Sequence, residues 1–247
     1  VAPLYGLLIT TLNGFWSPKT RWGELTPDHF RQVLWFDQNT RDSLFNSVYL
    51  GLVGATIGMI IAATISTYVQ RSTGKTATFI DGIAKLPAAV SGLILAVGFI
   101  LAFAGPPFGL QGTMLILLLA FIATHMPSGS IAADGAASQV GHSLLEAAYV
   151  SGASESRTFW KVSIPLMLPG LVAGWSLLFV RYAGDFQASA ILSSTRNQTA
   201  GKKIIEIYEM GSYAYLAALA MGLTAITGLI IGVVFALTRK RAAISVV

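Results

Sequence analysis

The sequence predicts an all-α fold, a polytopic membrane protein with about six transmembrane helices in one domain over residues 1–247. Three observations carry this prediction. Only 11% of the 247 residues are charged, against about 25% in soluble domains, and 54% are hydrophobic. Apolar runs of about 20 residues, long enough to cross a bilayer, recur along the chain. Cysteine is absent, which excludes a disulfide framework and thiol chemistry.

The start of the chain predicts one short span and one surface helix. Residues 1–16 are expected to form a truncated first helix, because the chain opens at Val1 already inside an apolar run. The polar stretch Trp16–Asp42 follows and is too long for a tight turn. It is expected to include an amphipathic helix near Asp28–Phe36.

The next two spans are bounded by clear signals. The second runs from about Leu44 to Val69, and its small residues suit close contact with another helix; these are Gly51, Gly54 and Gly58. The third runs from about Leu86 to Phe103. It ends at Gly105-Pro106-Pro107, because proline lacks the N–H that continues a helix.

Three further spans complete the prediction. The fourth covers about Thr113–Ala133 and is interrupted by Pro127, the fifth covers about Leu166–Gly184, and the sixth covers about Tyr215–Leu237. Lysine and arginine are shared almost evenly between the two sets of loops, so their count does not orient the chain. The basic cluster after the sixth span favours a cytoplasmic C-terminus.

A polar stretch interrupts the apolar pattern between the fourth and fifth spans. It reads "EAAYVSGASESRTFWKVSIPL" at residues 146–166. Gly152 can end a short helix in a left-handed conformation, and Ser154 can begin the next helix as its N-cap. Pro165 suits the first turn of the helix that follows. Residues 140–165 therefore predict a helix–turn–helix at the membrane surface, a shape that a soluble partner can grip.

This stretch resembles the EAA loop of binding-protein-dependent ABC importer permeases. The family pattern is E-A-A, three residues, G, nine residues, then I-x-L-P. Glu146-Ala147-Ala148, Gly152 and Val162-Ser163-Ile164-Pro165 match it in register. Val for Ile and Ile for Leu are the departures, and both keep the apolar character.

The resemblance implies a mechanism and a set of partners. In this family the loop is cytoplasmic, and its short coupling helix docks on an ATP-hydrolysing subunit. Glu146 would contact the ATPase, Ala147 and Ala148 would stay small so that it can approach, and Gly152 would make the turn before Ile164 and Pro165. The implied protein is a multi-pass permease of the bacterial inner membrane, with its C-terminus in the cytoplasm.

The expected partners are an ATP-binding cassette dimer, a second permease half (identical, sister or fused), an external substrate-binding protein and membrane lipids. ATP and Mg would be bound by the ATPase partner. No cofactor, metal, catalytic residue or nucleic acid is expected for this chain, which is predicted not to be an enzyme. The "GKT" at Gly74–Thr76 lacks the upstream glycine-rich loop of a nucleotide-binding motif.

The substrate is less well marked. Arg181 and Asp185 lie four residues apart in "RYAGDFQASAIL" and could form an ion pair at a helix end or serve a pathway or gate. This run resembles the R-E-F-x-A-T/S pattern of sulfate, molybdate and ferric-iron importers, with Asp for Glu. The region 194–222 resembles the ferric-iron branch, whose relatives include thiamine, polyamine and aminophosphonate systems. Ferric iron is the favoured substrate, and these others are the alternatives.

Other classes of protein fit the sequence less well. A secondary transporter would show inverted repeats and several mid-membrane carboxylates, and only Asp185 qualifies. A membrane enzyme would cluster its histidines, whereas His29, His125 and His142 lie in unrelated segments. His125, beside Met126-Pro127, is expected to make a hydrogen bond between helices instead of binding a metal. A scaffold without transport activity would have no use for the loop pattern.

Overall fold

A computed structural model describes residues 2–13, 22–23, 25–72, 74–141, 146–148 and 150–244, with the backbone alone for residues 155, 156 and 239–244. All regular structure in these ranges is helical. Four of their helices are long and apolar enough to cross a membrane, or five if one bent pair counts as a span. The predicted all-α polytopic fold is therefore confirmed.

The start of the chain forms short helices. Helix α1 (Ala2–Leu12) is apolar, but at 11 residues it is shorter than a span. The surface helix expected near Asp28–Phe36 is present as α2 (Asp28–Arg31) followed by the π-turn η1 (Gln32–Phe36). Residues 14–21 lie outside the described ranges.

Three long helices form the centre of the molecule and pack against one another in pairs: α3 (Gln38–Arg71), α6 (Met114–Ala137) and α9 (Ile164–Ala183). The glycines predicted to allow close contact do so. A methyl group at Gly51 would lie 3.0 Å from the ring of Phe179, and one at Gly54 would lie 2.7 Å from the ring of Tyr182. The second span is therefore held directly against the fifth.

A second seam of small residues joins α9 to α6. A methyl group at Gly170 would lie 2.7 Å from the Cβ of Ala136, and one at Gly174 would lie 2.8 Å from the Cβ of Ala132. Small residues four apart on both helices let the backbones approach closely, which is a common way for helices to associate in membranes. The sequence carries this signal as Gly-x-x-x-Gly at positions 170–174, although the prediction above did not use it.

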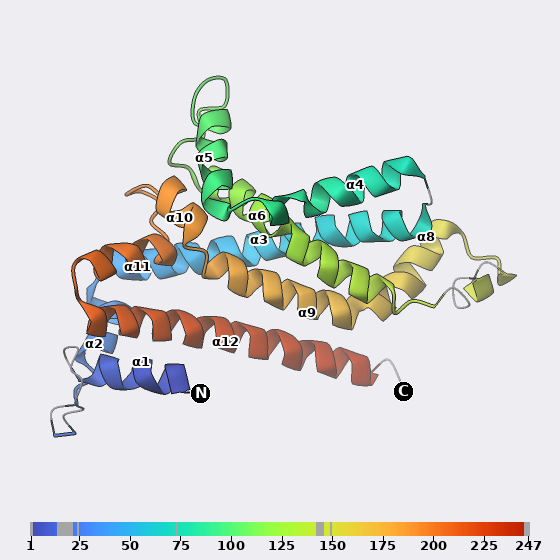
Figure 1. Ribbon diagram of the computed structural model, residues 1–247. Helices are drawn as coiled ribbons and strands as arrows, with labels where there is room; N and C mark the ends of the chain where they lie inside the picture. The colour runs from blue at the N-terminus through green and yellow to red at the C-terminus, as the bar shows by residue number, and fades with distance from the viewer. Residues whose placement is uncertain are drawn as a thin grey trace.

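The predicted third span, 86–103, is wrong as a single straight helix. Helix α4 (Lys75–Lys85) and the 3₁₀ turn η2 (Leu86–Ala89) are bent by 110° from α5 (Gly92–Phe103). Pro87 lies in the turn, and Val90 and Ser91 have extended backbone. Figure 1 shows α5 projecting from the bundle. Helix α5 ends before Gly105-Pro106-Pro107, as predicted.

Pro127 does not interrupt the fourth span, contrary to prediction. Helix α6 is continuous through this buried proline. Helices α3 and α9 pack on α6 and keep it in place. Neighbouring helices of this kind are the usual reason that proline is tolerated within a membrane helix.

The remaining helices follow the loop, from residue 155 to residue 244. Helix α8 (Glu155–Thr158) and the π-turn η3 (Phe159–Ser163) continue directly into α9. After α9 come α10 (Gln187–Leu192), α11 (Ala200–Glu209) and α12 (Tyr213–Ile244). Helix α12 packs along α1, α9 and α11.

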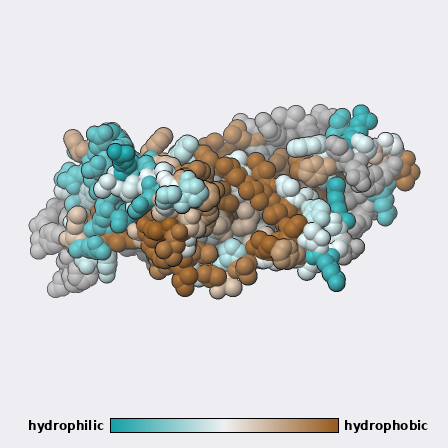
Figure 2. All heavy atoms as spheres, turned by 90° about the horizontal axis from the view of Figure 1, so that it is seen from above, coloured by the Kyte–Doolittle hydropathy of each residue, from teal (hydrophilic) through white to brown (hydrophobic). Residues whose placement is uncertain are grey.

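We call the right-hand end of Figure 1 the loop end; it holds residues 146–154, the turn between α3 and α4, and the end of α12. The opposite end holds α2 and the turn between α11 and α12. In Figure 2 hydrophobic residues gather over the middle of the visible face, and hydrophilic residues gather toward both ends. This distribution is the one expected for a bundle that crosses a bilayer.

Candidate functional site

The EAA stretch forms a helical turn that ends at Gly152. Residues 146–148 and 150 are helical, and Gly152 has a φ of +79°. The amide of Ala153 donates to the carbonyl of Ala148 at 3.1 Å, which closes a Schellman-type helix end. A left-handed backbone conformation at this position favours glycine, because glycine has no Cβ to collide with the backbone. The predicted turn at Gly152 is confirmed.

Ser154 begins the next helix, as predicted. Its Oγ accepts a hydrogen bond from the amide of Arg157 at 3.4 Å, and its carbonyl accepts one from Thr158 at 2.9 Å. Helix α8 starts directly after it at Glu155. Two local signals, glycine at a helix end and serine at the next N-cap, therefore determine the shape of this segment.

The turn presents small residues to the outside. Glu146 and Ala147 are exposed, Ala148 is partly exposed, and Val150 is 90% exposed. An apolar side chain this exposed makes almost no contact with its own chain. The turn lies at the loop end, where the last turns of α12 also lie (Figure 1). Its exposed apolar surface suits contact with another macromolecule.

The second arm of the predicted helix–turn–helix is not a separate surface helix. It runs through η3 into α9, so that the candidate span begins at Phe159 and not near Leu166. The amide of Ile164 donates to the carbonyl of Phe159, five residues back, which defines the π-turn. Pro165 follows in the first turn of α9, as predicted. Movement of the loop is therefore linked to α9 through helical backbone.

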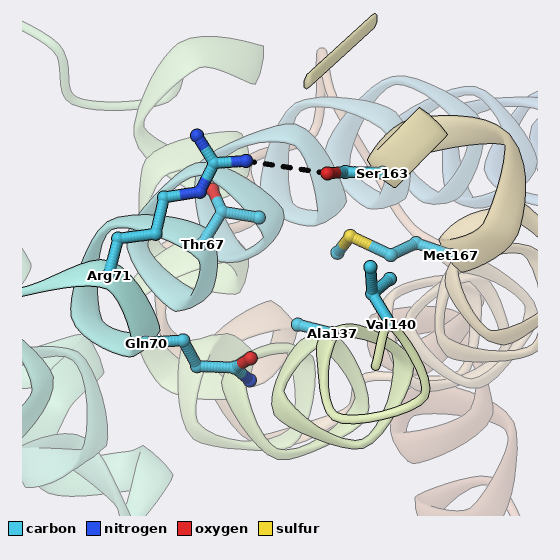
Figure 3. Close-up of a pocket in the computed structure, with 7 residues that line it drawn as sticks. All are labelled: Thr67, Gln70, Arg71, Ala137, Val140, Ser163 and Met167. Atoms are coloured by element: carbon cyan, nitrogen blue, oxygen red, sulfur yellow. Dashed lines mark hydrogen bonds between the residues drawn. The ribbon is translucent and has the colours of Figure 1, made fainter. Parts of the chain in front are cut away.

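Arg71, at the end of α3, joins this segment from the side. Its guanidinium donates to Ser163 Oγ at 3.3 Å and lies over the ring of Phe159 at 5.5 Å. Figure 3 shows Arg71 reaching across a cavity of about 50 Å³ between α3, the end of α6 and α9. This contact could not be predicted from the sequence pattern, because its partners are 92 residues apart.

A larger apolar groove of about 560 Å³ lies between α3 and the η3–α9 segment. Met59, Trp160, Ile164 and Trp175 are among its lining residues. The indole N–H of Trp175 donates to Thr56 Oγ1 at 3.0 Å, which fixes one side of the groove. Ile164 of the EAA pattern thus faces this groove and not the exposed turn.

Arg181 and Asp185 are not partners, contrary to the pairing considered from the sequence. Helix α9 ends at Ala183, so that Asp185 leaves the helical face on which Arg181 lies exposed. Asp185 is buried, and its Oδ2 lies 3.0 Å from Nε2 of His125. The hydrogen bond expected for His125 is thus confirmed, and its partner is Asp185.

The other oxygen of Asp185 caps the next helix. Oδ1 accepts hydrogen bonds from the amides of Ala188 at 2.9 Å and Ser189 at 3.3 Å. Three elements, α6, the end of α9 and α10, therefore meet at one carboxylate. Within the described residues no group of three or more His, Asp or Glu side chains is arranged to hold a metal ion.

Comparison with known proteins agrees with this geometry. The chain is 27% identical over 176 residues to the ferric transport system permease protein FbpB of Actinobacillus pleuropneumoniae; the match covers 71% of this chain and 26% of that protein. It is 30% identical over 181 residues to a probable sulfate transport system permease protein cysT of Chlorella vulgaris, which covers 70% of this chain and 68% of that protein. The chain thus spans about a quarter of the length of the ferric relative.

A solved structure shows the same fold. It is a bacterial ABC transporter involved in the import of the acidic polysaccharide alginate, with a TM-score of 0.75 at 17% identity, covering 97% of this chain and 89% of that chain. The family model for the binding-protein-dependent transport system inner membrane component matches residues 54–240, about three quarters of the chain. The chain therefore belongs to this family and is a permease subunit of an ABC importer, a multi-pass protein of the inner membrane.

Proposed function

We propose that this permease is driven by a separate ATPase subunit that docks on the turn formed by residues 146–154. The observation that carries the proposal is the shape of this turn: a short helix closed by Gly152, with Ala147 exposed and Val150 90% exposed. The exposed apolar surface of this turn favours burial by a partner.

The docking surface assigns a role to each residue of the pattern. Glu146 offers a carboxylate to the ATPase, and Ala147 and Ala148 leave room for it. Gly152 holds the turn, while Ile164 and Pro165 start the helix that receives the movement. ATP and Mg are bound by the partner, and the loop end with the C-terminus faces the cytoplasm. A second permease half completes the pathway, and an external binding protein delivers the solute at the opposite end.

The docking turn is tested by purifying the complex with the ATPase subunit of the same importer. Gly152→Ala forces a Cβ into the left-handed region, which costs about 1 to 2 kcal/mol locally. Glu146→Lys reverses the charge at the surface. Each is expected to weaken ATPase binding about tenfold, measured by titration in detergent.

Gly211→Ala is the matched control. Gly211 also has a left-handed φ, of +74°, and like Gly152 it has open space where a Cβ would stand, but it lies at the opposite end. Its variant should bind the ATPase as the native chain does. The docking proposal fails if the native chain binds no ATPase, or if Gly152→Ala and Gly211→Ala bind the ATPase with the same affinity.

For the substrate we propose ferric iron, on the resemblance of the region 194–222 and the similarity to a ferric transport permease. The sulfate permease relative makes sulfate the leading alternative, with molybdate, aminophosphonate, polyamine and thiamine behind it. Purified binding proteins loaded with ferric iron or sulfate should be compared for stimulation of ATP hydrolysis by the reconstituted complex. Stimulation by the sulfate protein alone contradicts the iron proposal.

A further inference from the structure

The joint between α8 and α9 is a weak point in the helix that links the loop to the bundle. The π-turn η3 makes its hydrogen bond over five residues in place of four, a geometry that is rare and appears often at functional sites. Pro165 follows it, and proline has no N–H to strengthen the next turn. A movement of the loop can therefore be absorbed at η3 unless a contact from another helix holds it.

Arg71 is that contact. It lies in the last turn of α3 and meets both ends of the π-turn, with its guanidinium over Phe159 at one end and donating to Ser163 at the other. Ser163 is 3% exposed, so water cannot easily replace the arginine as the hydrogen-bond partner of its hydroxyl. Figure 3 shows the guanidinium directed from α3 toward Ser163.

The end of α3 is itself held in place. Gln70 Nε2, next to Arg71, donates to the carbonyl of Asp134 on α6 at 3.3 Å. Asp134 also accepts from Lys85 Nζ of α4 at 2.8 Å. The end of α3 thus reaches α6 and, through it, α4, whereas Arg71 is its link to η3. A displacement of η3 has a direct path to α3 through the Arg71 side chain.

We propose that Arg71 is a positioning residue for coupling: it clamps the π-turn to α3, so that α3 and α9 move together when the ATPase moves the loop. This proposal rests on the proposed function. It assigns Arg71 no contact with the ATPase and no contact with the transported solute.

The test uses the absence of cysteine from the chain, which lets two introduced cysteines carry spin labels without a background. Thr64→Cys on α3 and Leu168→Cys on α9 are exposed positions on the same groove. The distance between the labels is measured in the complete complex with its ATPase, before and after trapping with ATP and vanadate. ATPase affinity and thermal unfolding are measured on the same samples.

The expected result is specific. With native Arg71 the distance between the labels stays the same on trapping, because the two helices move together. With Arg71→Gln it changes by about 2 Å, the scale of helix shifts in switching proteins. Arg71→Lys falls between, because lysine can donate to Ser163 but has no planar group to lie over Phe159. Adding Ser163→Ala to Arg71→Gln should cause no further change.

Arg41→Gln is the matched control, the same substitution at an exposed position on the same helix, near its other end. It should behave as native. If the distance between the labels in Arg71→Gln is the same before and after trapping, the clamp proposal is wrong, whether or not the variant is less stable. A tenfold loss of ATPase affinity in this variant also overturns the clamp, because it would place Arg71 in the docking surface. Failure of the proposed function appears differently, as absence of ATPase binding by the native chain, and it overturns the clamp as well.

Discussion

The two ends of α9 are built differently. At the loop end α9 passes through a π-turn into an exposed helical turn, and the side contact described above comes from an exposed arginine. At the other end Asp185 is buried and accepts three hydrogen bonds, from His125 and from the amides of Ala188 and Ser189. One end of α9 therefore leads into an exposed turn, whereas the carboxylate at the other end joins α6, α9 and α10.

The same contrast holds for the neighbouring helices. At the opposite end Tyr215 of α12 donates to Asp37, just before α3, at 2.7 Å. The amide of Ala200 on α11 donates to Ser47 Oγ of α3 at 2.8 Å, and Asn46 donates to the carbonyl of Gln198 at 2.9 Å. Hydrogen bonds between distant segments therefore join α3 to α11 and α12 at this end, whereas at the loop end they join α3 to α6 and η3. Substitutions here should cost stability, and substitutions in the exposed turn should cost coupling.

Asp185→Ala should have the largest effect. It leaves two buried amides and the partly buried imidazole of His125 without their acceptor, which costs about 3 to 5 kcal/mol of the free energy of unfolding. Thermal unfolding of the purified protein in detergent measures the loss. Asp42→Ala, at an exposed carboxylate of α3, is the control and should unfold with the native protein. If the two variants unfold at the same temperature, Asp185 does not hold α6, α9 and α10 together, and the contrast between the two ends of α9 is lost.

Gly201→Ala comes second. Gly201 of α11 is buried, and a methyl group there would overlap the backbone carbonyl of Asp185 and lie 2.9 Å from the Cα of Phe186. Because backbone atoms cannot rotate away, we expect a loss of about 1 to 3 kcal/mol. Gly98→Ala on α5, where a methyl meets nothing within 4 Å, should not destabilise. A stable Gly201→Ala protein would show that α11 can move relative to Asp185.

Asp37→Asn should cost less, and its effect should depend on pH. Burial alone raises the pKa of Asp37, but hydrogen bonds from Thr40 and Tyr215, together with the charge of Lys203, outweigh it and leave the pKa below its ordinary value. A lowered pKa in the folded state adds stability above the pKa of the unfolded chain, and this stability is lost as pH falls through the folded pKa.

The destabilisation by Asp37→Asn is therefore expected to be about 1 kcal/mol near pH 7 and to shrink below about pH 4. Unfolding curves of native and variant protein at a series of pH values measure it. A difference between the two proteins that grows as the pH falls would contradict the assigned role of the carboxylate.

Val150→Ser should have the smallest effect on folding. Val150 is 90% exposed, and surface substitutions of this kind change stability by less than about 0.5 kcal/mol. The same variant should still weaken ATPase binding under the proposed function, because it removes apolar surface from the docking turn. A large fall in unfolding temperature would mean that the turn packs on the rest of the chain, and the contrast between the two ends would then be lost.

Much of the candidate site could be predicted from the sequence because it depends on neighbours in the chain. The left-handed Gly152, the N-cap at Ser154 and the end of α5 before Gly105 follow from rules that act over a few residues. The count of spans was less accurate. Whether an apolar run is one straight helix depends on what packs against it, and the run at 86–103 is broken where α4 turns into α5.

The sequence by itself determined that this is a helical membrane protein with a helical turn closed at Gly152, since hydrophobic runs and local backbone signals are sufficient for both. Tertiary structure decided which polar groups meet. Asp185 is paired with His125, 60 residues away, and not with Arg181 four residues before it. Arg71 reaches Ser163 across 92 residues. The physical reason is that a buried polar group forms hydrogen bonds with the groups that helix packing brings near it. The spacing of residues within one segment does not determine how the helices pack.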